Sequence, residues 1–99
     1  MVRPDRIDIP FHIAQAMRST NPELKRFVRA GLDSIAANPE SGEPLQSELS
    51  KYWKYRVRRF RIIYEIDRQA RTVRIMSIGH HREVYEELAD RLRGIGIEG

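Results

Sequence analysis

The stretch that decides the fold is YWKYRVRRFRIIYEI, residues 52–66. Aromatic and β-branched residues dominate it, and they alternate with polar residues in the period-two pattern of half-buried strands. We predict two adjacent antiparallel strands here, joined by a tight turn near Arg58 and Arg59. One face of this strand pair is apolar, and it carries Trp53, Tyr55, Val57, Phe60, Ile62, Tyr64 and Ile66.

Basic residues gather on the opposite face of the same strand pair. If the apolar faces line up, Lys54, Arg56 and Arg61 project together from that face. Residues 51–74 hold nine of the 18 Lys and Arg residues but only two acids, Glu65 and Asp67. The net charge of +4 and the sequence pI of about 9.8 agree with this local excess. The pattern favours a polyanion or an acidic protein as partner, and the alternative is that these cations only keep the strands soluble.

The length and composition predict one folded domain over residues 1–99. A chain of this length can bury a single core, and its 40% hydrophobic content suits a folded protein. The absence of cysteine excludes disulfides and thiolate metal sites. No apolar run approaches the roughly 20 residues that cross a bilayer, and the N-terminus has no apolar signal segment. We therefore expect a cytoplasmic protein with no membrane association.

The rest of the sequence predicts helices before and after the central strand pair in the chain. In chain order, the other expected elements are a short strand (6–9), a brief helix (11–18), a long helix (to Asn38), a loop (38–51), a strand (71–79) and a last helix (from Arg82 or Glu83). The long helix begins either in a capping box from Thr20 to Glu23 or at Asn21 with Pro22 in the first turn. Its apolar stripe predicts a core-facing side, and it consists of Leu24, Phe27, Val28, Leu32, Ile35 and Ala36. In the strand 71–79 the expected alternation places Val73, Ile75 and Ser77 on one face of the strand and Arg74, Met76 and Ile78 on the other face.

Two longer segments carry a resemblance to a known family. WKYRVRRFRIIYEID (53–67) and VRIMSIGHHREVYEEL (73–88), in this order after the short strand and the helices, resemble the RelE/ParE superfamily of bacterial and archaeal toxin–antitoxin toxins. The resemblance is strongest over residues 45–88. It implies an α+β fold: a small twisted antiparallel sheet of about four strands, with two N-terminal helices packed on one face and a C-terminal helix. On the other face, ribosome-dependent members have a basic concavity that cuts messenger RNA in the ribosomal A site.

The resemblance also assigns roles to individual residues. Cleavage of RNA without a metal requires a base, cations that stabilise the charged transition state, and an acid for the leaving oxygen. Arg61 matches a residue that clamps the scissile phosphate, and Lys54 and Arg56 match residues that stabilise charge or transfer a proton. His81, whose ordinary pKa is near 6.5, is the candidate general acid or base; Tyr85 matches a tyrosine that stacks on RNA or assists proton transfer. Further RNA contacts are expected from Arg58, Arg59, Arg74 and Arg82, and Arg82 competes with His81 for the same role.

Some of these residues have structural alternatives. Arg56 and Arg58 could solvate the sheet or pair with an acidic antitoxin, and Tyr85 could pack against the sheet. The adjacent His80 and His81 point in different directions on a strand or turn, which makes them a poor metal pair. We therefore expect neither a metal nor a cofactor.

Three functions follow from the residues and the resemblance. The favoured one is a metal-independent, ribosome-dependent mRNA endoribonuclease that inhibits translation, because Lys54, Arg56, Arg61 and His81 occur together. The alternatives are a ParE-like DNA gyrase inhibitor, which performs no chemistry of its own, and a non-toxic basic relic that binds RNA or protein. Either toxin implies a cognate antitoxin that is small, acidic and partly disordered, with a segment that folds against the basic sheet and the apolar edge and neutralises the charge that binds RNA.

Overall fold

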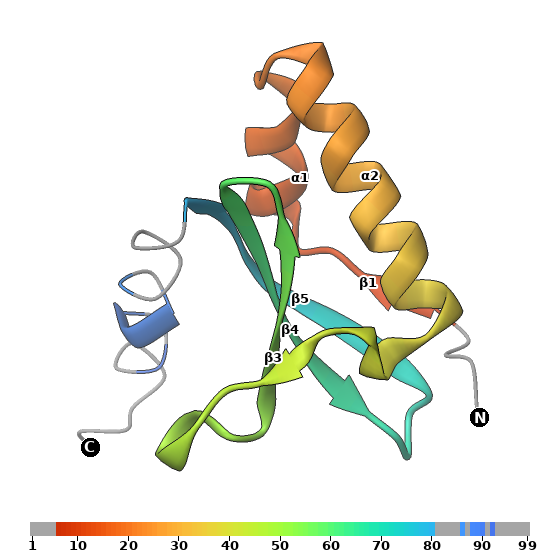
Figure 1. The fold of residues 1–99 in the computed structure, drawn as a ribbon, viewed down its shortest axis with the longest axis vertical. Helices are drawn as coiled ribbons and strands as arrows, with labels where there is room; N and C mark the ends of the chain where they lie inside the picture. The colour runs from red at the N-terminus through yellow and green to blue at the C-terminus, as the bar shows by residue number, and fades with distance from the viewer. Residues whose placement is uncertain (1–5, 81–85, 87, 91, 93–99) are drawn as a thin grey trace.

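A five-stranded sheet forms the centre of the structure, and two helices cover one of its faces (Figure 1). The structure is a computed structural model that describes residues 6–80, 86, 88–90 and 92. Its elements are β1 (Arg6–Asp8), α1 (Phe11–Arg18), α2 (Pro22–Ala37), the 3₁₀ turn η1 (Pro39–Ser41), β2 (Glu43–Pro44), the 3₁₀ turn η2 (Ser47–Leu49), β3 (Tyr52–Val57), β4 (Phe60–Asp67) and β5 (Thr72–His80). Near the C-terminus, the described residues 86, 88–90 and 92 are helical. No helix in the described part of the chain has the length and apolar character needed to span a membrane.

The sheet has the order β1-β5-β4-β3-β2, and this confirms the predicted α+β class. The central strands β3, β4 and β5 are antiparallel neighbours, as expected. Two details differ from the expectation of about four antiparallel strands. β1 lies parallel to β5, and the expected loop 38–51 contributes a fifth strand, β2, which pairs with Lys54 and Trp53 of β3. A two-residue strand has no measurable period, so its sequence carried no signal.

The β3–β4 hairpin forms as its alternation predicts. Val57 faces Phe60 across the strands, so Arg58 and Arg59 make the turn, and Arg58 has a φ of 56°. A positive φ is characteristic of two-residue hairpin turns, although glycine or asparagine usually supplies it. On the side of the sheet that faces α1 and α2, six of the seven expected apolar residues join a core with Ile13, Val28 and Ile35; they are Trp53, Tyr55, Val57, Ile62, Tyr64 and Ile66.

β5 contains an irregularity that the sequence did not predict. Ile63 faces Ser77 while the next residue, Tyr64, faces Ile75, so Met76 is an extra residue in β5. Such a bulge switches the side on which later residues project. Ile78 therefore joins Val73 and Ile75 in the core below the helices, whereas Met76 packs on the other side. The expectation that Ser77 shares a face with Val73 and Ile75 was wrong for this reason.

Asn21, rather than Thr20, caps α2. The Asn21 side chain accepts a hydrogen bond of 2.8 Å from the Leu24 N–H, and Pro22 occupies the first turn. This arrangement satisfies one of the free N–H groups at the helix start. Figure 1 shows α2 running along the sheet with α1 beside its N-terminal half.

Gly31 lets α2 approach β3 and β4 closely. A methyl group at this position would lie 2.9 Å from Val57 Cγ2 and 3.0 Å from Ile62 Cδ1. Gly31→Ala is therefore expected to lower the free energy of unfolding by about 1–2 kcal/mol, because overpacking outweighs the gain in helix propensity. Urea unfolding of Gly31→Ala measures this change in stability, with Ala30→Gly, at an exposed position of the same helix, as the control. A more stable Gly31→Ala protein would show that the contact relaxes without cost.

A buried tyrosine fixes the chain between α2 and β3. The Tyr64 hydroxyl donates a 2.6 Å hydrogen bond to the Pro39 carbonyl and accepts one of 3.2 Å from the Gly42 N–H. Its side chain is fully buried, and this burial raises the pKa of Tyr64 to about 12. The ring also stacks on Trp53 at a centroid distance of 6.3 Å. β2 is thereby held at the edge of the sheet beside Lys54.

A second, smaller core covers part of the opposite face of the sheet. Leu45, Tyr52, Ile63 and Leu88 are its buried members. Leu88 belongs to the predicted C-terminal helix; it is helical and fully buried in this core. This smaller core covers the part of the sheet around Tyr52 and Ile63. On the same face, the positions of β3 and β4 nearer the hairpin turn carry cations.

Candidate nucleic-acid interface

The basic cluster, defined as Lys54, Arg56 and Arg61, lies on the face of the sheet opposite α1 and α2. Arg56 and Arg61 are directly opposite each other across β3 and β4, and Lys54 lies two positions along β3, facing Ile63. Directly opposed residues have Cβ atoms roughly 4.5–5.5 Å apart, and like charges so placed repel. An anion bound between them would relieve that repulsion.

Arg61 is the most constrained member of the basic cluster. Its Nη1 donates to the carbonyl oxygens of Phe60 at 3.0 Å and Arg58 at 3.3 Å, which turns the guanidinium toward the hairpin turn. Its Nε is buried and has no hydrogen-bond partner among the described residues. A buried donor without a partner is costly, and such a position in a folded protein calls for an explanation other than stability.

Carboxylates neutralise the basic cluster only at one corner. Lys54 Nζ lies 3.9 Å from Glu43 Oε1, a long contact with an exposed carboxylate. In the described part of the chain, neither Arg56 nor Arg61 has an ion-pair partner. Exposed pairs such as Lys54–Glu43 contribute little and are screened by salt. The cluster therefore retains an excess of positive charge.

Arg74 lies apart from the basic cluster. Its Nη1 is 2.9 Å from Asp67 Oδ2 and 3.8 Å from Glu65 Oε1, and Glu65 also approaches Lys51 at 3.8 Å. The Ala70 N–H, and after it Arg74, lower the pKa of the Asp67 carboxyl. Arg74 faces Glu65 of β4, and Glu65 lies four positions along β4 from Arg61, a distance of about 13 Å. Its surroundings support a structural ion-pair role at the far end of the sheet.

Arg58 and Arg59 form the tip of the β3–β4 hairpin. The Arg58 guanidinium lies 4.2 Å from the centre of the Phe27 ring on α2. Nearby, the Phe60 and His80 rings are 4.5 Å apart. The sequence placed Phe27 only in the core stripe, because its helical spacing gives no sign of a partner so distant in the chain.

Three of the predicted site residues, His81, Arg82 and Tyr85, lie outside the described residues. Their assigned roles therefore stay predictions. Gly79 of β5 faces Arg61, and the strand ends at His80. Among the described residues, no three potential metal ligands come together.

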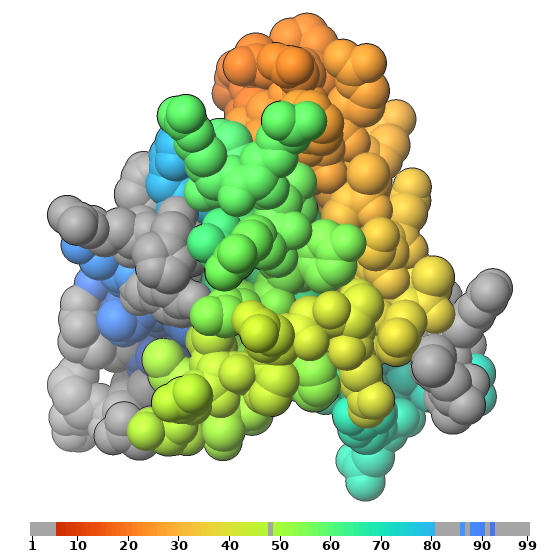
Figure 2. Space-filling model, in the orientation of Figure 1, coloured from red at the N-terminus to blue at the C-terminus, as the bar shows by residue number. Residues whose placement is uncertain are grey.

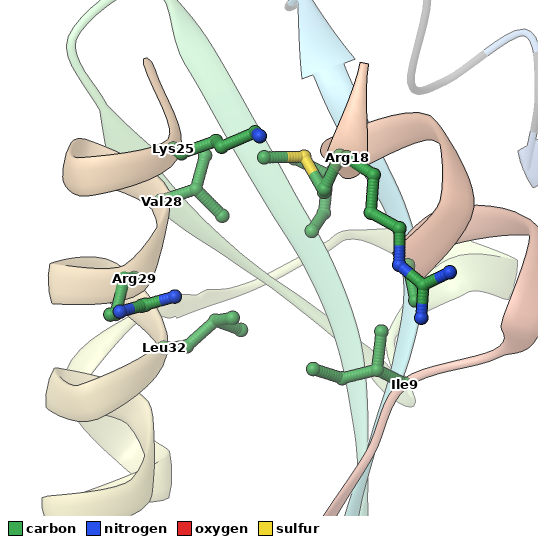
Figure 3. Close-up of a pocket in the computed structure, with 9 residues that line it drawn as sticks. Ile9, Arg18, Lys25, Val28, Arg29 and Leu32 are labelled. Carbon is green, nitrogen blue, oxygen red and sulfur yellow. The ribbon is translucent and has the colours of Figure 1, made fainter. Parts of the chain in front are cut away.

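A groove between α1 and α2 forms a second surface, on the other side of the sheet (Figure 3). We call it the helix groove; its volume is about 360 Å³. Its apolar lining consists of Ile9, Ala14, Met17, Val28, Leu32 and Ile78. Three cations line it as well: Arg18 from α1 and Lys25 and Arg29 from α2. The exposed Phe11, 71% accessible, begins α1 shortly after Ile9.

Comparison with solved structures shows that this fold is known in toxin proteins. A double arginine-to-alanine variant of the RelE toxin from E. coli has a TM-score of 0.72 and 18% identity, with 91% of this chain and 98% of that chain covered. A chain of the RelBE2 toxin–antitoxin complex from Mycobacterium tuberculosis has a TM-score of 0.70 and 22% identity, covering 82% and 95%. YoeB from Staphylococcus aureus, solved as a dimer, has a TM-score of 0.62 and 22% identity, covering 81% and 99%. These likenesses establish the fold.

A family comparison goes further than the fold. A search of curated proteins found no match. Residues 2–85 match the family model of the ParE toxin of the type II toxin–antitoxin system parDE. The match spans most of the chain, and it includes the segment 53–67 and residues 73–85 of the second segment on which the resemblance was based. The chain therefore belongs to the ParE toxin family of type II toxin–antitoxin systems, within the RelE/ParE superfamily.

Proposed function

We propose that this toxin is a metal-independent endoribonuclease that cuts messenger RNA on the ribosome. The observation that carries the proposal is the opposition of Arg56 and Arg61 on β3 and β4, with the buried Arg61 Nε lacking a partner among the described residues. A phosphate diester supplies the negative charge that this pair of cations lacks, and its oxygens accept hydrogen bonds from guanidinium N–H groups. Guanidinium groups suit that ligand, because their planar N–H edges match phosphate oxygens.

The chemistry requires one bond to form and one to break. The ribose 2′-oxygen attacks the adjacent phosphorus, a base takes the 2′-proton, and the bond to the 5′-oxygen breaks as an acid protonates that oxygen. Arg61 and Arg56 would stabilise the extra negative charge on the phosphoryl oxygens, and Lys54 would assist beside them. His81 remains our candidate for proton transfer, and Tyr85 for contact with the RNA.

A second candidate function is inhibition of DNA gyrase, and the family match favours it. In that case the toxin binds a protein and needs no group that transfers a proton. The two functions would depend on different residues. Cleavage would require the basic cluster and His81, whereas gyrase binding would tolerate the loss of His81 and depend on surface contacts from the helices.

Induced expression of the toxin separates the two candidates. We expect growth arrest together with new 5′ ends in a reporter messenger, detected by primer extension. A gyrase supercoiling assay with purified toxin and a measurement of DNA breaks run in parallel. Arrest with gyrase inhibition and no new RNA ends would overturn the ribonuclease proposal in favour of the gyrase inhibitor.

We further propose that a cognate antitoxin binds in the helix groove, in addition to the expected contact of its disordered segment with the basic sheet. Several of the similar structures are toxin–antitoxin complexes, such as RelBE of E. coli and YoeB–YefM of S. aureus. The apolar lining of the groove would accept the apolar face of an amphipathic helix. Its cations, Arg18, Lys25 and Arg29, would complement acidic residues on that helix.

Charge reversal in the helix groove tests this partner. Lys25→Glu combined with Arg29→Glu is expected to weaken antitoxin binding about tenfold or more, because attraction becomes repulsion. Binding is measured by calorimetry, and toxicity by growth with the antitoxin co-expressed. Arg26→Glu, an exposed position on the same helix that does not line the groove, is the matched control. Equal affinities for all three proteins would place the antitoxin elsewhere.

A further inference from the structure

A second hollow lies where the tip of the β3–β4 hairpin meets the first turns of α2. Arg58, Arg59 and Phe60 line it from the hairpin, and Leu24 and Phe27 line it from α2. We call it the tip pocket; its volume of about 450 Å³ falls in the range of roughly 300–1,000 Å³ that is usual for ligand sites. Figure 2 shows the hairpin tip, in green, against the orange N-terminal part of the chain.

The side chain of Arg58 contacts an aromatic ring that lines the tip pocket. Its guanidinium lies over the Phe27 ring at 4.2 Å, and the residue as a whole is exposed. The guanidinium is thus held against an aromatic ring in a residue that stays accessible to a ligand. Unpaired bases stack on arginine planes and aromatic rings in this way.

The backbone of Arg58 is in an unusual conformation for this residue type. Its φ is 56°, a region that glycine enters freely and arginine rarely. Glycine would adopt the positive φ that this turn requires, so the geometry of the turn does not explain why arginine occupies the position. Strained positions of this kind cluster at binding sites. The stacked, positively charged side chain is the feature that glycine would not provide.

The tip pocket and the basic cluster adjoin each other through β4. Consecutive strand residues point to opposite faces, so Phe60 faces the tip pocket while Arg61 belongs to the basic cluster. The charged lining of the tip pocket consists of two arginines and one carboxylate, Glu23. A polyanion that crosses the hairpin tip would thus contact cations on both sides of the sheet.

We propose that the tip pocket binds one unpaired nucleotide of the RNA, with its base stacked on the Arg58 guanidinium and its phosphate paired with Arg59. This inference rests on the proposed ribonuclease function, because that function brings an RNA chain to the neighbouring basic cluster. It adds a contact outside the cleavage site and assigns Phe27 the role of holding the Arg58 plane in place.

Binding of single-stranded RNA by the purified full chain tests the proposal without any cleavage. The probe is a 2′-O-methyl oligoribonucleotide, which cannot be cut, and affinity is measured by fluorescence anisotropy at several salt concentrations. Arg58→Lys keeps the charge but loses the flat stacking surface, so we expect affinity to fall about fivefold to a hundredfold with an unchanged salt dependence. Arg59→Ala should instead reduce the slope of log K against log salt by about 0.7.

Two further variants make the result specific. Arg58→Gly fits the positive φ, so it should unfold at or above the wild-type temperature while losing the same affinity as Arg58→Lys or more. Arg68→Ala, which removes a cation from the turn after β4, is the matched control and should bind as the wild type does, apart from a small general charge effect. This comparison separates loss of the stack from loss of the fold and from loss of net charge.

The outcomes distinguish this inference from the proposed function. Wild-type affinity for Arg58→Lys would overturn the tip pocket, even if Arg61→Ala abolishes binding and cleavage. Failure of the wild type to bind the oligonucleotide would also overturn it, and the messenger-cleavage experiment would still decide the proposed function. Weakened binding by Arg58→Lys in a toxin that cuts no RNA would support the tip pocket and remove the ribonuclease.

Discussion

Arg61→Ala is expected to lower the rate of messenger cleavage by about 10²–10³-fold, the usual loss when one preorganised donor to a charged transition state is removed. Arg61 is the member of the basic cluster whose guanidinium is already oriented, by hydrogen bonds to the Phe60 and Arg58 carbonyls. Among the described residues it has no ion-pair partner, so a bound phosphate would supply its counter-charge. Single-turnover cleavage on programmed ribosomes measures the rate.

The stability of the Arg61 variant provides an internal check. Truncation removes a buried donor without a partner and also the like charge opposite Arg56, so we expect unfolding free energy to change by less than about 1 kcal/mol. Arg61→Lys keeps the charge but loses the Nε–H edge, and it should stay well below wild-type activity. Full cleavage by either variant, with Arg68→Ala as the control, would remove Arg61 from the site.

Gly42→Ala is expected to destabilise the fold by about 3 kcal/mol or more. A methyl group here would overlap the Lys54 carbonyl oxygen and would lie 2.7 Å from the Tyr64 hydroxyl oxygen. The first of these atoms belongs to the backbone of β3, so it cannot rotate away. Relief of the overlap would push β2 off the edge of the sheet and break the hydrogen bond between the Gly42 N–H and Tyr64.

Urea unfolding measures the effect of Gly42→Ala. Ser41→Ala, at the exposed neighbouring position, is the control. Tyr64→Phe should cost about 1–3 kcal/mol, because it leaves the Pro39 carbonyl and the Gly42 N–H without their partner. A Gly42→Ala protein within 0.5 kcal/mol of the wild type, roughly the size of an ordinary surface substitution, would contradict the close packing described here.

The sequence predicted the parts of the fold that have a clear period. The alternation of β3 and β4 placed Lys54, Arg56 and Arg61 on one face, and the helical spacing of α2 identified its buried side, which the structure confirms for Val28 and Ile35. The α+β class and the superfamily followed from the same segments.

Features that depend on contacts between distant segments could not be predicted. The bulge in β5 depends on pairing with β4, and no residue type near Met76 predicts it. β2 forms because Tyr64 and β3 hold it, and the contact between Arg58 and Phe27 joins residues that are remote in sequence. The burial of Arg61 Nε likewise results from the folded hairpin rather than from local sequence.

The parallel pairing of β1 with β5 has a consequence for how the toxin is made. Residues 6–8 find their strand partners only at residues 72–74, and the helices and the β3–β4 hairpin lie between them. During synthesis α1, α2 and the hairpin emerge first, while β4 still lacks the neighbour with which it makes most of its sheet contacts. Contacts of such long sequence separation form late. The newly made chain therefore cannot complete its sheet until translation has passed β5, which leaves an interval in which a partner can meet the toxin before it is fully folded.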